Sequence, residues 1–275
     1  MSARIQALER EVGGSLFNRG RKVTLTERGV SFLPYARRAL AALQDGMEMA
    51  RLAHTGGRGR LAIGVLRSLT GSFLGPTLAQ FHQQYPEVEC YVREGEHWQL
   101  VEMLCDGVIE IAVICWPCLD PLLADMTPVV HLREPIVLAV PQDNPLVNRT
   151  GVTQEELLVH TDLFLLLRWW QATPIHIARL AAQATLVADV PMDTGRFLLR
   201  SGVGVGFFAK MMILPDIKVG QVVEIPVLDL PPIHRDIALV HLTRHSALSS
   251  TAINFIQQLK LEAQKQELLA EGRID

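Results

Sequence analysis

Two short motifs in the sequence have residue types and spacings that could do chemistry. Cys115-Trp116-Pro117-Cys118 has the C-x-x-C spacing of thiol redox sites. Such sites place the first cysteine at the start of a helix, whereas no helix is predicted to begin here. A zinc site would need two more ligands, and the sequence contains no second C-x-x-C. The pattern favours structural cysteines beside a cleft, and thiol or metal sensing by Cys115 and Cys118 stays open as the alternative.

The second motif, Gly202-Val203-Gly204-Val205-Gly206, resembles a glycine-rich nucleotide loop. A nucleotide loop follows a strand and opens a helix, but these glycines follow a predicted helix and lead into a strand. We therefore interpret them as a helix C-cap and a tight turn. The histidines are scattered, and the sequence contains no G-x-S-x-G, H-E-x-x-H or P-loop motif. The expectation is no catalytic residues, no cofactor and no bound metal.

Composition narrows the class of protein further. The 275 residues are 49% apolar, which is enough for a sizeable core and excludes a chain that is mainly disordered. No uncharged apolar run reaches the length of a membrane-spanning helix, and the polar N-terminus does not look like a signal peptide. Four cysteines are too few for a disulfide scaffold. These features predict a cytoplasmic protein without membrane contact.

Charge is distributed unevenly along the chain. The first 60 residues contain eleven Lys or Arg and five Asp or Glu, so their net charge is +6. The total is −3, which leaves −9 for the rest. A basic head on an acidic body indicates an anionic partner for the head, with nucleic acid as the leading candidate and a solvated charged surface as the alternative.

The head is predicted to contain a helix, a basic hairpin and a second helix. Residues 2–12 have helical apolar spacing, and Gly13 with Gly14 should end that helix. Three cations lie in the following turn, and residues 23–25 have the β-branched character of a short strand. Thr26 is a suitable N-cap for the next helix. In a winged helix-turn-helix, such a wing contacts phosphates while the helix lies in the major groove.

Residues 2–29 resemble the N-terminal signature of LysR-type transcriptional regulators. The matching segments are Ser2-Ala3-Arg4-Ile5, Leu8-Glu9, Gly13, Leu16-Phe17-Asn18-Arg19 and Leu25-Thr26-Glu27-Arg28-Gly29. The resemblance continues to the far end of the chain. It implies that residues 1–25 form a partial winged helix-turn-helix, made of the end of the recognition helix plus the wing. The residues implied to contact double-stranded promoter or operator DNA are Ser2, Arg4, Arg19, Arg21, Lys22 and Thr26.

The family pattern implies two more helices before Ser2. A start codon assigned too late, or a trimmed sequence, would account for this departure. The alternative is a ligand-binding or heterodimerising module without competent DNA binding.

Residues 26–58 are predicted to form a linker helix and hinge. Its apolar residues have 3-4 heptad spacing: Leu33, Ala36, Leu40, Leu43, Met47, Ala50 and His54. Pro34 should bend the helix near its start. The pattern alone also fits an amphipathic helix packed on its own domain. The resemblance favours a homodimer through this helix, and homotetramers built as dimers of dimers.

Residues 59–275 are predicted to form an α/β effector-binding domain. Strands and helices alternate in two units, which indicates parallel sheets covered by helices. This pattern looks like the periplasmic-binding-protein type II fold. We expect lobe I at about 60–133 and 243–275, and lobe II at about 134–242, with a small molecule bound between them.

Ligands in such folds lie at the carboxyl ends of strands, near helix N-termini. This rule selects loops whose cation, hydroxyls and tryptophans suit an anionic or aromatic effector. A glutamate in the set could instead accept from an amine or a hydroxyl. The predicted effector-binding residues are Arg67, Ser68, Thr70, Glu96, Trp116, Arg168, Trp169, Asp193 and Thr194.

Overall fold

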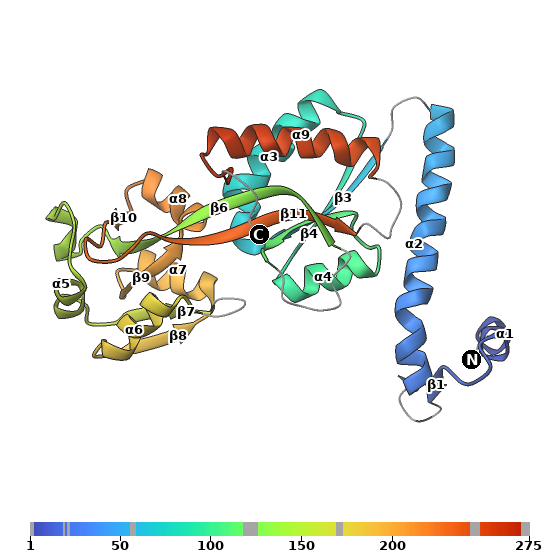
Figure 1. Ribbon diagram of the computed structural model, residues 1–275, viewed down its shortest axis with the longest axis horizontal. Helices are drawn as coiled ribbons and strands as arrows, with labels where there is room; N and C mark the ends of the chain where they lie inside the picture. Colours follow the sequence, from blue (N-terminus) through green and yellow to red (C-terminus); the bar gives the residue numbers. More distant parts are fainter. Residues whose placement is uncertain are drawn as a thin grey trace.

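The computed structural model describes residues 3–18, 20, 23–55, 59–117, 126–168, 173–242 and 248–270. An N-terminal unit and one long helix stand at one end of the molecule, beside an elongated α/β body (Figure 1). Within the described residues, no helix is both long and apolar enough to span a membrane.

The N-terminal unit contains the predicted helix, hairpin and second helix. Its elements are α1 (Ala3–Glu11), β1 (Phe17–Asn18), β2 (Thr24–Leu25) and α2 (Glu27–Thr55), with β1 and β2 antiparallel. The predicted stop after α1 is confirmed, because Gly13 has a φ of +76° and the Gly14 N–H donates to the Glu9 carbonyl at 2.9 Å. The predicted N-cap is also confirmed, since the Thr26 hydroxyl accepts from the Gly29 N–H at 3.0 Å.

Helix α2 presents the predicted apolar stripe to solvent in the single chain. Leu40, Leu43 and Met47 have exposed fractions of 60%, 61% and 63%. Pro34 lies inside the helix, as predicted. The side chains of the last two residues of the predicted stripe, Ala50 and His54, lie outside the described part.

The described strands of the body form one sheet in the order β4-β3-β5-β11-β6-β9-β7-β8, with β10 also paired to β6. Strand β3 is parallel to β4 and β5, and β7 is parallel to β8 and β9, whereas β6 and β11 run antiparallel to each other. The predicted parallel β-α-β-α-β unit of lobe I is therefore confirmed. The strands are β3 (Arg60–Leu66), β4 (Glu89–Gly95), β5 (Ile111–Cys115), β6 (Met126–Pro141), β7 (Phe164–Leu167), β8 (Val187–Val190), β9 (Val205–Ala209), β10 (Val222–Ile225) and β11 (Ile233–Leu242).

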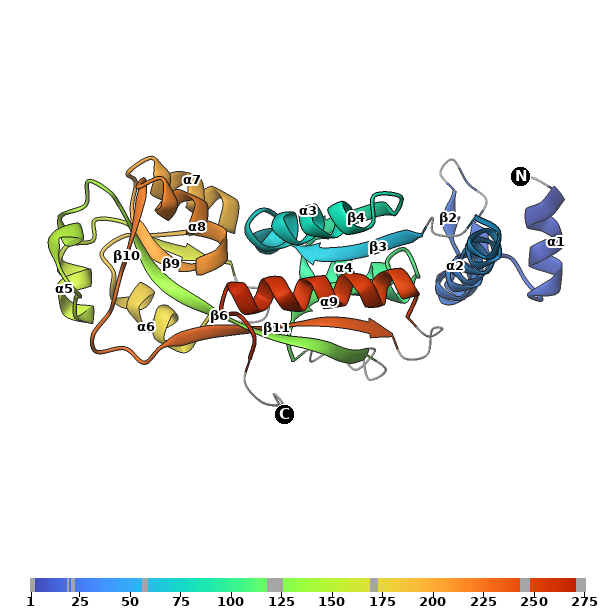
Figure 2. The ribbon, with the colours of Figure 1, turned by 90° about the horizontal axis from the view of Figure 1, so that it is seen from above.

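Helices surround the two ends of this sheet (Figure 2). Helices α3, α4 and α9 lie beside the end that contains β3, and α5 to α8 lie beside the end that contains β7. A 3₁₀ turn, η1 (Arg67–Leu69), and a π-helical turn, η2 (Thr70–Leu74), connect β3 to α3. The helices are α3 (Gly75–Gln84), α4 (His97–Cys105), α5 (Gln154–Val159), α6 (Ile175–Gln183), α7 (Met192–Arg200), α8 (Lys210–Lys218) and α9 (Ser250–Lys265), and η4 (Pro145–Asn148) is a further 3₁₀ turn.

Strands β6 and β11 cross from one lobe to the other, and this corrects the predicted boundary. The sequence prediction placed residues 237–242 in lobe II and began lobe II, with a strand of its own, at Glu134. In the structure, residues 237–240 pair with β5, and this half of β11 belongs to the lobe I core. Strand β6 begins at Met126, so its 16 residues extend through both lobes. The polar and proline residues at 133–135 interrupt the apolar pattern and conceal this continuity.

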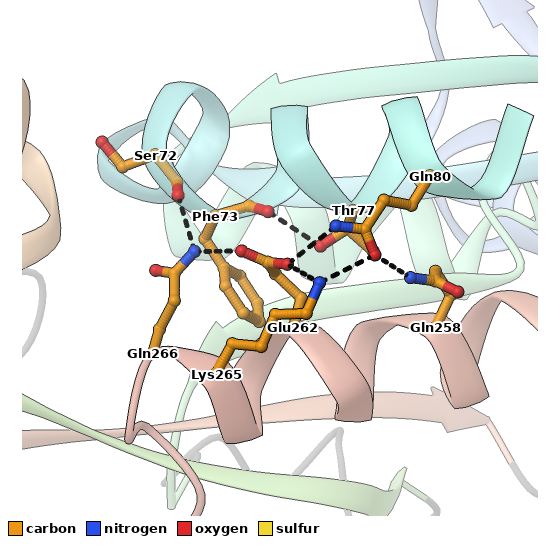
Figure 3. Close-up of polar contacts among 8 residues, drawn as sticks. All are labelled: Ser72, Phe73, Thr77, Gln80, Gln258, Glu262, Lys265 and Gln266. Atoms are coloured by element: carbon orange, nitrogen blue, oxygen red, sulfur yellow. Dashed lines mark hydrogen bonds and ion pairs between the residues drawn. The ribbon is translucent and has the colours of Figure 1, made fainter. Parts of the chain in front are cut away.

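The C-terminal helix α9 is anchored on lobe I. Phe255 packs edge-on against Phe81 of α3, with ring centroids 5.3 Å apart. Beside this contact, the Gln80 carboxamide oxygen accepts from Gln258 at 2.5 Å and from Lys265 at 3.1 Å (Figure 3). The chain therefore stays on lobe I after β11, whose second half already belongs to that lobe.

The packing of β9 against β7 generates a first prediction. A Cβ added to Gly206 would lie 2.6 Å from the Leu165 carbonyl oxygen, a backbone atom that cannot rotate away. We expect Gly206→Ala to lower the free energy of unfolding by about 1–3 kcal/mol, measured by urea denaturation. Gly71→Ala is the matched control, because no atom lies within 4 Å of the added Cβ. Equal stability of the two variants would contradict this account of Gly206.

Candidate functional site

The loops that follow the parallel strands bring the two lobes into contact. Arg67 follows β3 in lobe I, and Asp193 lies in the first turn of α7, directly after β8 in lobe II. The Arg67 Nε lies 3.6 Å from an Asp193 carboxylate oxygen. The carboxyl ends of strands from both lobes therefore meet at one place, which is where α/β folds bind ligands.

Arg67 has a second carboxylate partner within its own lobe. Its guanidinium Nη1 lies 3.2 Å from Glu94 Oε1, near the end of β4. The Thr70 hydroxyl donates to the other oxygen of Glu94 at 2.8 Å. Three residues of the predicted effector set, Arg67, Thr70 and Asp193, thus lie together. Glu94 joins them and was missed, because an acid at the end of a strand carries no distinctive signal in the sequence.

A buried ion pair lies on the two crossing strands beneath this group. Glu134 of β6 and Arg235 of β11 face each other in the antiparallel ladder, with Arg235 Nε 2.5 Å from Glu134 Oε2. The Glu134 side chain is 0% exposed and that of Arg235 is 11% exposed. The pair is completed by the Met211 N–H, which donates to Glu134 at 2.8 Å, and by the Ser68 hydroxyl, which accepts from Arg235 at 2.6 Å.

This network joins both lobes to the crossing strands. Ser68 belongs to lobe I, whereas Met211 lies in α8 of lobe II. Met211 is itself buried in the lobe I core, and Leu214 packs against that core. The sequence prediction included Ser68 but missed Glu134 and Arg235, whose pairing depends on the register of two strands far apart in the chain.

The other predicted effector residues that the structure describes either pair with a different residue or are exposed. Arg168 lies 3.3 Å from Asp189 of β8 and is exposed. Glu96 is exposed at the start of α4, where its N–H donates to the Gln99 side chain at 2.8 Å. Thr194 is exposed in the first turn of α7. Trp169 lies outside the described residues.

Trp116 and Cys115 lie at the end of β5. The Trp116 ring packs edge-on against His131 of β6, with centroids 6.4 Å apart, and the described contacts do not join it to Arg67. Cys115 is 3% exposed within the lobe I core, a position that gives no support to a reactive thiol. Cys118 lies outside the described residues. In the part of the chain that the structure describes, no three His, Cys, Asp or Glu residues are grouped so that they could hold a metal.

At the other end of the molecule, a buried glutamate fixes α1 to the hairpin. Glu9 is 8% exposed, and its carboxylate accepts from the backbone N–H of Leu16 at 2.8 Å and of Phe17 at 3.3 Å. Arg4 is exposed on α1. The Thr26 hydroxyl donates to the Ser15 carbonyl at 2.8 Å besides capping α2, so its hydrogen bonds are internal. Ser2, Arg19, Arg21 and Lys22 lie outside the described residues.

The Glu134–Arg235 pair generates a second prediction. Glu134→Gln keeps the shape of the side chain but leaves the buried Arg235 without its counter-charge. We expect a loss of about 3–5 kcal/mol in the free energy of unfolding, measured by urea denaturation. Arg133→Gln is the matched control, because Arg133 and Asp236 form the next pair in the same ladder but have side chains that are 50% and 25% exposed. The prediction fails if both variants lose the same small amount.

Comparisons with known proteins agree with this architecture. Residues 54–264 match the family model described as the LysR substrate binding domain. The regulator AlsR of Bacillus subtilis is 28% identical over 213 residues, covering 75% of this chain and 70% of AlsR. CbbR of Rhizobium meliloti is 28% identical over 250 residues, covering 84% of this chain and 74% of CbbR.

Solved structures show the same fold. A full-length OxyR variant from Pseudomonas aeruginosa has a TM-score of 0.70 at 20% identity, covering 98% of this chain and 87% of that one. Full-length CbnR in complex with its target DNA has a TM-score of 0.65 at 19% identity, covering 94% and 88%. The family model matches residues 54–264, which is most of the chain, and the full-length structures share the fold: the chain belongs to the LysR family of transcriptional regulators.

Proposed function

We propose that this chain is a DNA-binding transcriptional regulator whose activity is set by a small molecule bound between its two lobes. The observation that carries the proposal is the meeting of strand ends from both lobes at Arg67 and Asp193. A ligand at this place touches both lobes at once. A ligand that binds one arrangement of the lobes more tightly than another therefore shifts the equilibrium towards the arrangement it prefers.

The N-terminal unit is the proposed DNA-contacting part. Helix α1 and the β1–β2 hairpin have the arrangement expected for the end of a recognition helix followed by a wing, and Glu9 fixes one to the other. CbnR, whose structure is similar, was solved with its target DNA. In the proposal, Ser2 and Arg4 lie on the recognition helix, while Arg19, Arg21 and Lys22 contact phosphates. Because its proposed partner is promoter DNA, as in this family, we propose that the protein is located in the cytoplasm.

The linker helix α2 is the proposed dimerisation element. Leu40, Leu43 and Met47 expose an apolar stripe with heptad spacing, and a second copy of the helix would cover it. Two copies would place two DNA-contacting units at a fixed spacing, which suits two half-sites. We propose a homodimer through this stripe, and tetramers formed from two such dimers.

The domain limits that fit this function are 1–25 for the partial winged helix-turn-helix, 26–58 for the linker helix and hinge, and 59–275 for the effector-binding domain. Within the last, the crossing of β11 divides the lobes near Asp236.

The wing cations generate a third prediction. The triple variant Arg19→Gln, Arg21→Gln, Lys22→Gln should bind duplex DNA more weakly and with less salt dependence. Each lost phosphate contact should reduce the slope of log K against log salt by about 0.9. Fluorescence anisotropy of a labelled duplex, titrated at several salt concentrations, measures this slope.

The control for that experiment removes three exposed cations from the body: Arg93→Gln, Lys218→Gln and Lys260→Gln. An unchanged slope in the wing variant, or an equal change in both variants, would refute the assignment of the wing. The titration is repeated on the chain extended by any in-frame codons that precede Met1 in the gene. Absence of duplex binding by both lengths would favour the ligand-binding or heterodimerising alternative.

The exposed stripe on α2 generates a fourth prediction. Leu43→Glu places a charge in the proposed dimer seam and should shift the mass measured by sedimentation velocity towards the next smaller assembly. Ser31→Glu is the control, because Ser31 is exposed on the same helix but outside the stripe. If Leu43→Glu sediments like the unmodified chain, the seam lies elsewhere.

A further inference from the structure

Arg67 is already held by carboxylates from both lobes. Glu94 of lobe I lies 3.2 Å from one guanidinium nitrogen, and Asp193 of lobe II lies 3.6 Å from another. The three side chains are 52%, 37% and 59% exposed, so a ligand from solvent can reach each of them. One cation and two carboxylates thus form a group, the Arg67 group, with a net charge of −1.

The described cations that directly follow β7 and β9 are already paired. Arg168 pairs with Asp189 and Lys210 pairs with Glu224, while Glu96, directly after β4, adds a further exposed carboxylate. Residues 118–125 and 169–172, which lie outside the described part, contain no Lys or Arg in the sequence. An anionic ligand would therefore meet an edge that is negative on balance.

The Glu134–Arg235 pair beneath the Arg67 group is charge-balanced, unlike that group. Glu134 is fully buried and accepts hydrogen bonds from Arg235 and from the Met211 N–H. The Nη2 of Arg235 donates a hydrogen bond to the Ser68 hydroxyl. A ligand carboxylate that took Arg235 would leave Glu134 buried without its counter-charge, which is unfavourable. Selection by charge therefore rests on the exposed Arg67 group.

The two signs of ligand charge have different consequences at the Arg67 group. A carboxylate-only ligand, whether it displaces Asp193 or Glu94 or adds at the Nη2 of Arg67, leaves three anions around one cation. A protonated amine placed between Glu94 and Asp193 instead gives two cations and two anions in alternation. It also bridges the lobes, because Glu94 and Asp193 belong to different lobes.

We propose that the effector carries a protonated amine, which lies between the carboxylates of Glu94 and Asp193. An α-amino acid is the simplest such molecule that also uses Arg67, since its carboxylate can replace Asp193 on the guanidinium while its ammonium group pairs with Asp193. The inference rests on the proposed effector site and replaces the anionic or aromatic effector expected from the sequence.

The test compares three probes of matched size on the full chain: butylamine, pentanoate and norvaline, which carry the amine, the carboxylate or both. Binding is measured by calorimetry at neutral pH and constant ionic strength. We expect butylamine and norvaline to bind and pentanoate not to bind. Asp193→Asn should weaken the two amine-bearing probes about tenfold, the effect of losing one charge-assisted hydrogen bond. Glu155→Gln, an exposed acid in α5, should change nothing.

Arg67→Gln separates the two amine-bearing probes. If the effector is an amino acid, this variant should weaken the binding of norvaline and leave the binding of butylamine unchanged. If the effector is a simple amine, the binding of neither probe should weaken. Pentanoate binding that depends on Arg67 would overturn the amine assignment while leaving the effector site in place. Absence of amine binding, or amine binding unaffected by Asp193→Asn, would also overturn it. The DNA titration tests the regulator function separately.

Discussion

The structure depends on one buried ion pair, Glu134 with Arg235, at the point where β6 and β11 cross between the lobes. A fully buried carboxylate is costly unless it is paired and hydrogen-bonded, and this one has Arg235 and the Met211 N–H. The pair also sets the register of the ladder. A slip of one residue would turn Glu134 towards the more exposed face that carries Arg133 and Asp236, and would leave Arg235 without its partner.

The same pair limits how the lobes can move. Ser68 reaches Arg235 from lobe I, and α8 approaches from lobe II with Met211 and Leu214 against the lobe I core. The crossing strands and this apolar contact hold the lobes on one side, whereas the exposed contact between Arg67 and Asp193 is weak. A ligand can therefore exchange with Asp193 at small cost while the buried joint remains intact. This division of strong and weak contacts suits a two-state sensor.

Much of the fold could be predicted from local sequence patterns. The stop at Gly13, the cap at Thr26, the long helix α2 and the parallel strands of lobe I all depend on residues close together in the chain. The prediction was wrong about the lobe boundary at β11, because a strand pairs with neighbours that its own residues do not specify. Helices α5 and α8 and strand β10 were not predicted, although α5 begins with a capping box of Thr153 and Glu156 that is visible in the sequence.

The sequence by itself determined the family, most of the elements and the loops that could form the site, since signatures and apolar periodicities are local. Only the tertiary structure decided which charged side chains are left without a partner inside the protein and can pair with a ligand. Arg67 and Arg168 look like free cations in the sequence, but folding places Glu94, Asp193 and Asp189 beside them. The bond between Arg235 and Ser68 spans 167 residues. Such contacts follow from strand register and lobe packing, so the charge that a ligand meets cannot be counted along the chain.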